Sequence, residues 1–197
     1  MRFFIGDKEK IIVKRLHGGD KSAMQDFYTL YADYLTSVCA RYIDNDDDLK
    51  DVLQDCMVKM LTSIGQFDYR GPGSLQAWAT RIVVNQSLSY IKRKRTAAIV
   101  SLDVDLPDEP EKDDPPIDHI PPEVIHQMVR ELPTGYRTVF NLYVFENKSH
   151  QEIAQLLGIK RDSSASQLHR AKNMLAKKIE QYNKTTLAQC TNNGELT

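Results

Sequence analysis

The stretch that decides the fold reads Ser149-His150-Gln151-Glu152-Ile153-Ala154-Gln155-Leu156-Leu157-Gly158. Ser149 and Glu152 have the spacing of a capping box, in which each side chain accepts a hydrogen bond from the free backbone N–H group of the other residue. The apolar residues that follow have helical spacing, and Gly158 suits the conformation that ends many helices. The stretch therefore predicts a short helix that ends at Gly158.

A second helix is predicted directly downstream, from about Ser163, with a core side of Leu168, Ala171, Leu175 and Ile179. A helix, a short glycine-containing turn and another helix form a helix-turn-helix. The side opposite Leu168 carries polar groups of the types that bond base edges and phosphates. These are Ser163, Ser166, Arg170, Asn173 and Lys177, with His169 beside them. A solvated helix face is the alternative, and the capped helix upstream favours DNA binding.

The rest of the chain also predicts helices. Apolar residues recur at spacings of three and four over 23–38, 49–64, 74–95 and 123–131, and again after Pro133. The acids before Leu49 suit a helix N-terminus, and Ser74 is the expected cap of the helix that ends in Lys92-Arg93-Lys94-Arg95. No segment alternates with strand period for long. The sequence therefore predicts an all-α fold.

Charge separates these helices into two groups. The 197 residues carry 26 Lys and Arg against 27 Asp and Glu, a net charge of −1. Residues 101–123 alone hold one basic and nine acidic side chains and six of the eight prolines. Like charges repel and prolines remove backbone donors, so we expect an extended linker. The predicted organisation is two small helical domains at 1–97 and 123–183, an acidic Pro-rich linker at 98–122 and a disordered tail at 184–197.

The chain lacks the motifs of common enzymes, metal sites and membrane proteins. Its three cysteines have no C-x-x-C spacing, which argues against a thiolate zinc site or a disulfide framework. Four acids match an EF-hand loop, but Leu49 stands where that loop needs glycine. Neither a signal peptide nor a stretch of about 20 apolar residues is present. We expect no catalytic residue, metal or cofactor, and a cytoplasmic protein without membrane insertion.

A loop precedes the helix predicted at 74–95, and a basic cluster forms the end of that helix. Phe67, Tyr69 and Arg70 are able to stack on unpaired bases, and the basic groups at 92–95 neutralise phosphates. The alternative for the cluster is that basic groups at a helix C-terminus complement the helix dipole and improve solubility.

Together these motifs resemble the extracytoplasmic-function (ECF) group of bacterial RNA polymerase sigma factors, in the sigma-70 family. The segments similar to region 2 of that family are Gly19-Asp20, 27–31, 48–55 and 74–85 with the basic run. The segments similar to region 4 are Leu132-Pro133 with Tyr136-Arg137, 149–159 and 166–172.

The resemblance implies a sigma factor that binds core RNA polymerase and directs initiation at particular promoters. The implied polymerase-binding residues are Asp48, Asp51, Gln54, Asp55 and Val58. Residues implied to recognise and melt the minus-ten element are Phe67, Asp68, Tyr69, Arg70, Asn85, Ser89, Lys92 and Arg93. Those implied to read the minus-thirty-five element are Lys160, Arg161, Ser163, Ser164, Ser166, Gln167, His169, Arg170 and Lys172.

The chain departs from the family pattern in the turn before the last helix. Ala165 stands where many members carry Lys or Arg, and Lys160-Arg161-Asp162 replaces the family's frequent Ser-x-Gly. Asp162 is an expected cap, and the promoter sequence does not carry over. Two alternatives stay open from the sequence: a polymerase-independent helix-turn-helix repressor or activator, which needs no docking helix, and an anti-sigma protein as a further partner.

Overall fold

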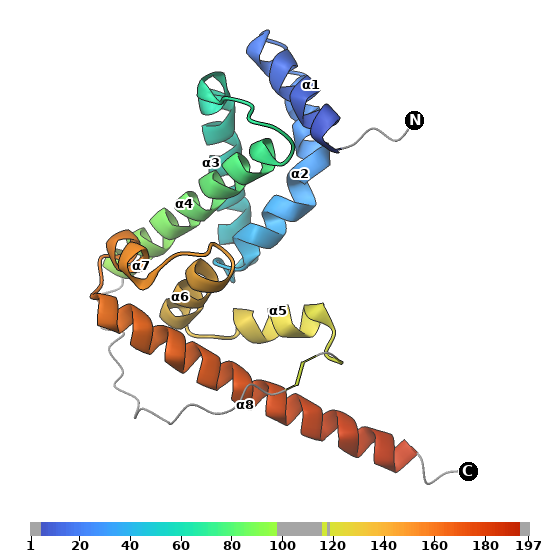
Figure 1. Ribbon diagram of the computed structural model, residues 1–197, viewed down its shortest axis with the longest axis vertical. Coiled ribbons are helices and arrows are strands. Elements are labelled where there is room, and N and C mark those ends of the chain that lie inside the picture. Colours follow the sequence, from blue (N-terminus) through green and yellow to red (C-terminus); the bar gives the residue numbers. More distant parts are fainter. Residues whose placement is uncertain (1–4, 98–115, 118, 194–197) are drawn as a thin grey trace. The chain divides into compact units, whose positions relative to one another are not determined.

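The computed structural model describes residues 5–97, 116–117 and 119–193, and all regular secondary structure there is helical (Figure 1). The chain divides into two compact units, residues 1–99 and 100–197. The prediction of an all-α fold with two helical domains is confirmed. Most of the predicted linker, residues 98–115 and 118, lies outside the described residues.

Unit 1 contains α1 (Ile5–His17), α2 (Ala23–Ala40), α3 (Asp46–Ser63), the 3-10 helix η1 (Ile64–Gln66) and α4 (Ser74–Ala97). Helices α2, α3 and α4 pack against one another, and α1 packs on α2. Their inward side chains include Phe27, Val38, Val52 and Val83, which are almost fully buried. Each such side chain contributes about 1.5–3 kcal/mol by leaving water. This core therefore fixes which faces of α3 and α4 stay exposed.

The start of α3 matches the expectation from its acids. The side chain of Asn45 accepts hydrogen bonds from the backbone N–H groups of Asp47 and Asp48, each at 3.0 Å. Three acids occupy the first turn, where the helix dipole favours negative charge. The run of acids therefore acts as a helix start, as the sequence predicts.

Unit 2 contains α5 (Pro122–Arg130), α6 (Thr134–Val144), α7 (His150–Leu157) and α8 (Arg161–Asn193). Its core joins α5, α6 and α8 through a cluster that includes Met128, Tyr136, Ala171 and Leu175. Ile120 also belongs to this cluster and is 6% exposed. Packed structure therefore begins inside the segment predicted as a linker up to residue 122.

The helix-turn-helix forms as the sequence predicts. Ser149 Oγ accepts a hydrogen bond from the Glu152 N–H at 3.3 Å, and Glu152 Oε2 accepts one from the Ser149 N–H at 2.9 Å. The N–H and hydroxyl of Ser149, with Lys148, lower the pKa of Glu152 to about 2. Its carboxylate therefore contributes to stability above pH 4.5 and loses that contribution as the pH falls toward 2. Gly158 ends α7 with a φ of 68°.

Helix α8 differs from the prediction at both ends. It begins at Arg161 rather than near Ser163, so Asp162 lies in the first turn. It continues to Asn193, although the sequence predicts disorder from Lys184. Neither glycine nor proline occurs between Ile159 and Asn193, and the hydroxyls of Thr185 and Thr186 bond back to carbonyls one turn earlier. Nothing in this stretch therefore ends the helix.

Replacing Ser149 with Ala is expected to lower the free energy of unfolding by about 1 kcal/mol, because Ala removes the acceptor for the Glu152 N–H. Thermal unfolding followed by circular dichroism at pH 7 measures the change. Ser166→Ala is the matched control, since it removes a hydroxyl from an exposed position on α8. Equal stability of the two variants would show that the capping box adds nothing.

Candidate protein and nucleic-acid interfaces

One face of α3 carries exposed acidic and apolar side chains in a line. Its residues follow helical spacing and are all exposed; we call them the α3 stripe: Asp51, Gln54, Asp55, Val58 and Leu61. The last two expose 57% and 45% of their surface, while Val52, Cys56 and Met60 on the opposite side are buried. Aliphatic side chains exposed beside carboxylates are typical of a protein-binding surface. Four of the five predicted polymerase-binding residues therefore share one accessible face.

Asp48, the fifth predicted residue, is engaged inside unit 1. Its Oδ2 accepts a hydrogen bond from Lys94 Nζ at 2.8 Å, and the same Nζ lies 3.1 Å from the hydroxyl of Tyr90. The hydrogen bond from Lys94 to the Asp48 carboxylate, and after it the one from Tyr90, hold the pKa of Asp48 below its usual value. The ion pair joins the start of α3 to the basic end of α4, so Asp48 is less available than the stripe.

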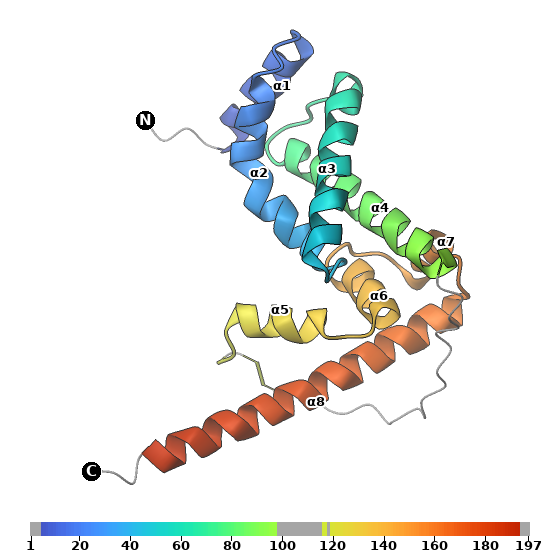
Figure 2. The same cartoon turned by 180° about the vertical axis from the view of Figure 1, so that it is seen from behind.

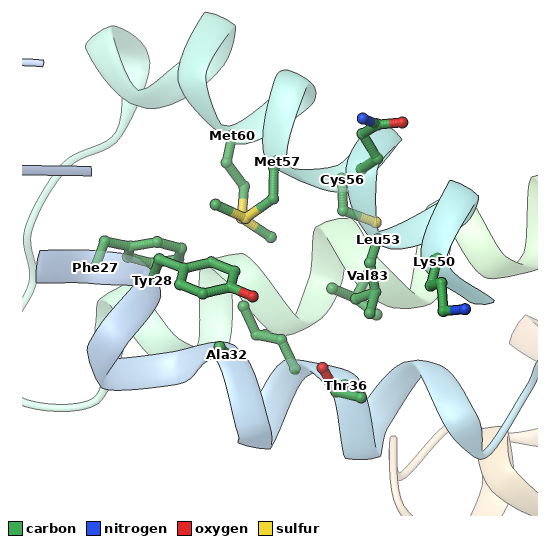
Figure 3. Close-up of a pocket in the computed structure, with 12 residues that line it drawn as sticks. Phe27, Tyr28, Ala32, Thr36, Lys50, Leu53, Cys56, Met57, Met60 and Val83 are labelled. Atoms are coloured by element: carbon green, nitrogen blue, oxygen red, sulfur yellow. The ribbon is translucent and has the colours of Figure 1, made fainter. Parts of the chain in front are cut away.

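An apolar groove lies next to the α3 stripe. It encloses about 250 Å³ and is lined mainly by α2 and α3. Figure 3 shows Met57 and Met60 of α3 pointing toward Phe27 and Tyr28 of α2. Gln54 belongs to both the groove and the stripe. The groove therefore adjoins the stripe at Gln54.

The loop from Phe67 to Gly73 contains two aromatic residues that differ in exposure. Phe67 is 8% exposed and packs on Trp78, with ring centroids 5.1 Å apart. Phe67, which the sequence predicts to stack on a base, is instead covered by the hydrophobic core of unit 1 in this structure. Asp68 and Arg70 are exposed and Tyr69 is half-buried. These three side chains are the polar and aromatic groups that the loop offers to a ligand, and Pro72 is exposed beside them.

Helix α4 presents a polar face in its C-terminal half. Asn85, Ser89, Lys92 and Arg93 are all exposed, and their spacing places them along one side of the helix. The Ser89 hydroxyl donates to the carbonyl oxygen of Asn85 at 2.8 Å. The predicted minus-ten residues on α4 therefore form a continuous surface that ends in positive charge.

The start of α4 is capped from a distance, which the sequence analysis misses. Ser74 does not act as the expected cap; its Oγ instead donates to the Gly71 carbonyl at 2.7 Å. Glu9 of α1 accepts hydrogen bonds from the N–H groups of Gly73 at 2.7 Å and Gln76 at 3.3 Å. Ile5, Glu9, Ile12 and Leu16 have helical spacing, so an acid inside an apolar stripe was the available signal.

The outward face of α8 carries most of the predicted minus-thirty-five residues. Lys160, Arg161, Ser166 and Lys172 are exposed, whereas the other accessible members are half-buried: Ser163, Gln167, His169 and Arg170. Asn173 Nδ2 lies 3.1 Å from His169 Nε2, so these side chains hold each other on that face. The surface combines basic groups with hydroxyl, amide and imidazole groups, which suits phosphate and base contacts.

Ser164 is the exception on α8. It is fully buried, and its Oγ lies 3.0 Å from Nδ1 of His150. Ser164, which the resemblance implies to contact DNA, therefore lies in the interior of unit 2 in this structure. Instead it joins the starts of α7 and α8 and fixes the geometry of the helix-turn-helix.

Metal and membrane sites receive no support from the described part of the chain. There, no three His, Cys, Asp or Glu side chains gather as a metal ion would need. No helix within the same residues is long and apolar enough to cross a membrane.

Comparison with known proteins matches both units. Residues 27–97 match the family model described as Sigma-70 region 2, and residues 123–175 match the one described as Sigma-70, region 4. The chain is 25% identical over 183 residues to the ECF RNA polymerase sigma-E factor of Haemophilus influenzae, covering 87% of this chain and 95% of that protein. It is 24% identical over 178 residues to the ECF RNA polymerase sigma factor SigW of Bacillus subtilis, covering 85% and 94%. The solved structure of CnrH in complex with the cytosolic domain of CnrY aligns with a TM-score of 0.47 at 20% identity, covering 88% of this chain and 97% of that one.

Proposed function

Because this chain belongs to the ECF group of the sigma-70 family of RNA polymerase sigma factors, we propose that it binds core RNA polymerase and directs initiation at a subset of promoters. The observation that carries this function is the order of the two family matches, with region 2 on unit 1 and region 4 on unit 2. The protein acts where the polymerase is, in the cytoplasm, and has no catalytic residue of its own.

The α3 stripe is the proposed docking surface for the polymerase. The family's region 2 docks on the clamp helices of the largest polymerase subunit, and the matching positions here are Asp51, Gln54, Asp55 and Val58. Their exposure supports the assignment. Acidic groups select a basic partner surface, and the apolar residues add buried area on docking.

The loop at 67–73 and the polar face of α4 are the proposed minus-ten surface. Tyr69 and Arg70 offer a ring and a guanidinium plane to an unstacked non-template base, and Asn85 and Ser89 offer hydrogen bonds. Extruding a base costs a few kcal/mol, which stacking in a pocket offsets. Lys92 and Arg93 hold the adjacent phosphates.

The outward face of α8 is the proposed minus-thirty-five surface. In a helix-turn-helix the second helix enters the major groove, and its first turns contact base edges. Lys160 and Arg161 lie at that end and are exposed. They supply the contacts to DNA phosphates that the uncharged Ala165 does not make. Ser166, His169 and Arg170 lie one and two turns further along α8 and face the bases.

Run-off transcription tests the function as a whole. Core polymerase with this protein is expected to initiate from a cognate promoter, while either component alone is not. The promoter comes from sequencing the DNA that the reconstituted holoenzyme retains from genomic fragments. If core polymerase alone makes the run-off transcript of the expected length, without this protein, the proposal is contradicted. Tight DNA binding without polymerase would instead favour a repressor.

A further inference from the structure

Glu9 is a buried charged side chain to which the proposed function assigns no role. It is 0% exposed, and its carboxylate accepts hydrogen bonds from the N–H groups of Gly73 and Gln76 and from the hydroxyl of Tyr31. Burial, followed by the bond to Glu9, raises the pKa of Tyr31, so this hydroxyl keeps its proton and donates. All three partners therefore donate to one carboxylate.

Helix α1 also contacts the residues that precede the loop at 67–73, whereas Glu9 binds the end of that loop. Nε2 of His17 lies 2.9 Å from the carbonyl oxygen of Ile64, to which it donates. Ile64 begins η1, which directly precedes Phe67, and Gly73 ends the loop. Figure 2 shows α1 on the side of unit 1 where the chain passes from α3 to α4. One helix thus fixes both ends of the loop at 67–73.

The sequence next to the loop restrains only part of it. Ser74 Oγ accepts a hydrogen bond from the Arg70 N–H group and donates one to the Gly71 carbonyl, whereas the Gly73 N–H group bonds to Glu9 of α1. Gly71 and Gly73 have φ values of 123° and 83°, which favour glycine, and glycine leaves the backbone free before folding. Within the loop, only Phe67 packs in the core. The first N–H groups of α4 also need acceptors, and a carboxylate there is favoured by the helix dipole. Glu9 meets both needs with one group.

We propose that α1 positions the 67–73 loop for capture of the promoter base and that Glu9 is the positioning residue. Its carboxylate orders the backbone at Gly73, which sets where Tyr69 and Arg70 are held, without touching DNA. This inference rests on the proposed role of the loop at the minus-ten element.

Glu9→Gln tests the inference with the smallest change in shape. A glutamine oxygen still accepts one N–H group, but its NH2 group then faces another N–H group and cannot accept. We expect the holoenzyme with this variant to bind a single-stranded non-template minus-ten oligonucleotide about tenfold more weakly. Its affinity for a minus-thirty-five duplex and for core polymerase is expected to stay within twofold. Amide exchange of Gly73 in the full chain should accelerate by a similar factor.

A matched control separates positioning from general stability. Val38→Ala removes volume from the core of unit 1 at a fully buried position, so it lowers the melting temperature without touching α1 or the loop. It should leave oligonucleotide binding unchanged in protein that is folded. Equal weakening by both variants, or loss of polymerase binding with Glu9→Gln, would make Glu9 merely structural and overturn the inference.

Tyr69→Ala distinguishes the failure of the inference from the failure of its premise. If this variant leaves oligonucleotide binding intact, the proposed role of the loop is wrong and the inference falls with it. If Tyr69→Ala weakens binding and Glu9→Gln does not, the loop keeps its role and only the positioning by α1 is wrong. Weakening by both, with Val38→Ala unchanged, supports the inference.

Discussion

Replacing both Asp51 and Asp55 with Arg is expected to lower the affinity for core polymerase about 100-fold and to abolish promoter-dependent transcription. Both carboxylates lie on the α3 stripe and are exposed, so the change should leave the free protein folded. In the complex, each guanidinium would face the basic surface that the carboxylates select. Like charges brought together at an interface cost several kcal/mol, and each 1.4 kcal/mol is about a factor of ten.

Fluorescence anisotropy of the labelled protein, titrated with core polymerase, measures this affinity. Asp33→Arg serves as the control, because Asp33 is equally exposed on α2 but lies outside the stripe. The affinity of the Asp33→Arg variant for core polymerase should match that of the unchanged protein. Unchanged polymerase binding by the double variant would remove α3 from the docking surface, whatever the effect on transcription.

The helices of both units could be predicted because their apolar spacing is regular. In α2, α3 and α4 the buried residues recur every three or four positions, as Phe27, Tyr31, Leu35 and Val38 do. The capping box and Gly158 were readable for the same reason, since both depend on residues within one turn of the helix end. Local rules therefore give the elements and the accessible face of α3.

The structure departs from the expectations of the sequence where a distant part of the chain decides the environment of a residue. Phe67 is adjacent to exposed loop residues in sequence, but Trp78 covers it. Ser164 lies within a polar run, but His150 of the preceding helix binds it. The cap of α4 comes from Glu9, more than sixty residues upstream. No spacing rule within a single helix contains these contacts, because tertiary packing creates them.

The extent of α8 shows a different limit. Its last turns are polar, a composition from which the sequence predicts disorder, yet polarity alone does not end a helix. A helix ends where a residue breaks it or where other groups satisfy its last carbonyls. The first glycine after Gly158 is Gly194, one residue beyond the end of α8. Helix length could therefore have been predicted from the absence of breakers.

Replacing Arg170 with Ala is expected to weaken promoter binding by the holoenzyme by about 1–3 kcal/mol, between about fivefold and 150-fold, if its guanidinium reads a base edge. Arg170 lies opposite the buried Leu168 on α8 and is half-buried, with its Nε atom buried, so part of the side chain is packed before DNA binds. This packing reduces the entropy that the side chain loses on binding, which favours a specific contact.

The measurement compares cognate promoter with the same fragment altered only in its minus-thirty-five element. Arg170→Ala should lose affinity for the cognate fragment and little for the altered one, because a base contact discriminates and a phosphate contact does not. Lys184→Ala is the matched control, since Lys184 is an exposed basic residue on the same helix, beyond the buried Leu175 and Ile179. Equal losses on both fragments would assign Arg170 to phosphate contact. A lower melting temperature with unchanged promoter affinity would instead assign its side chain to the packing of unit 2.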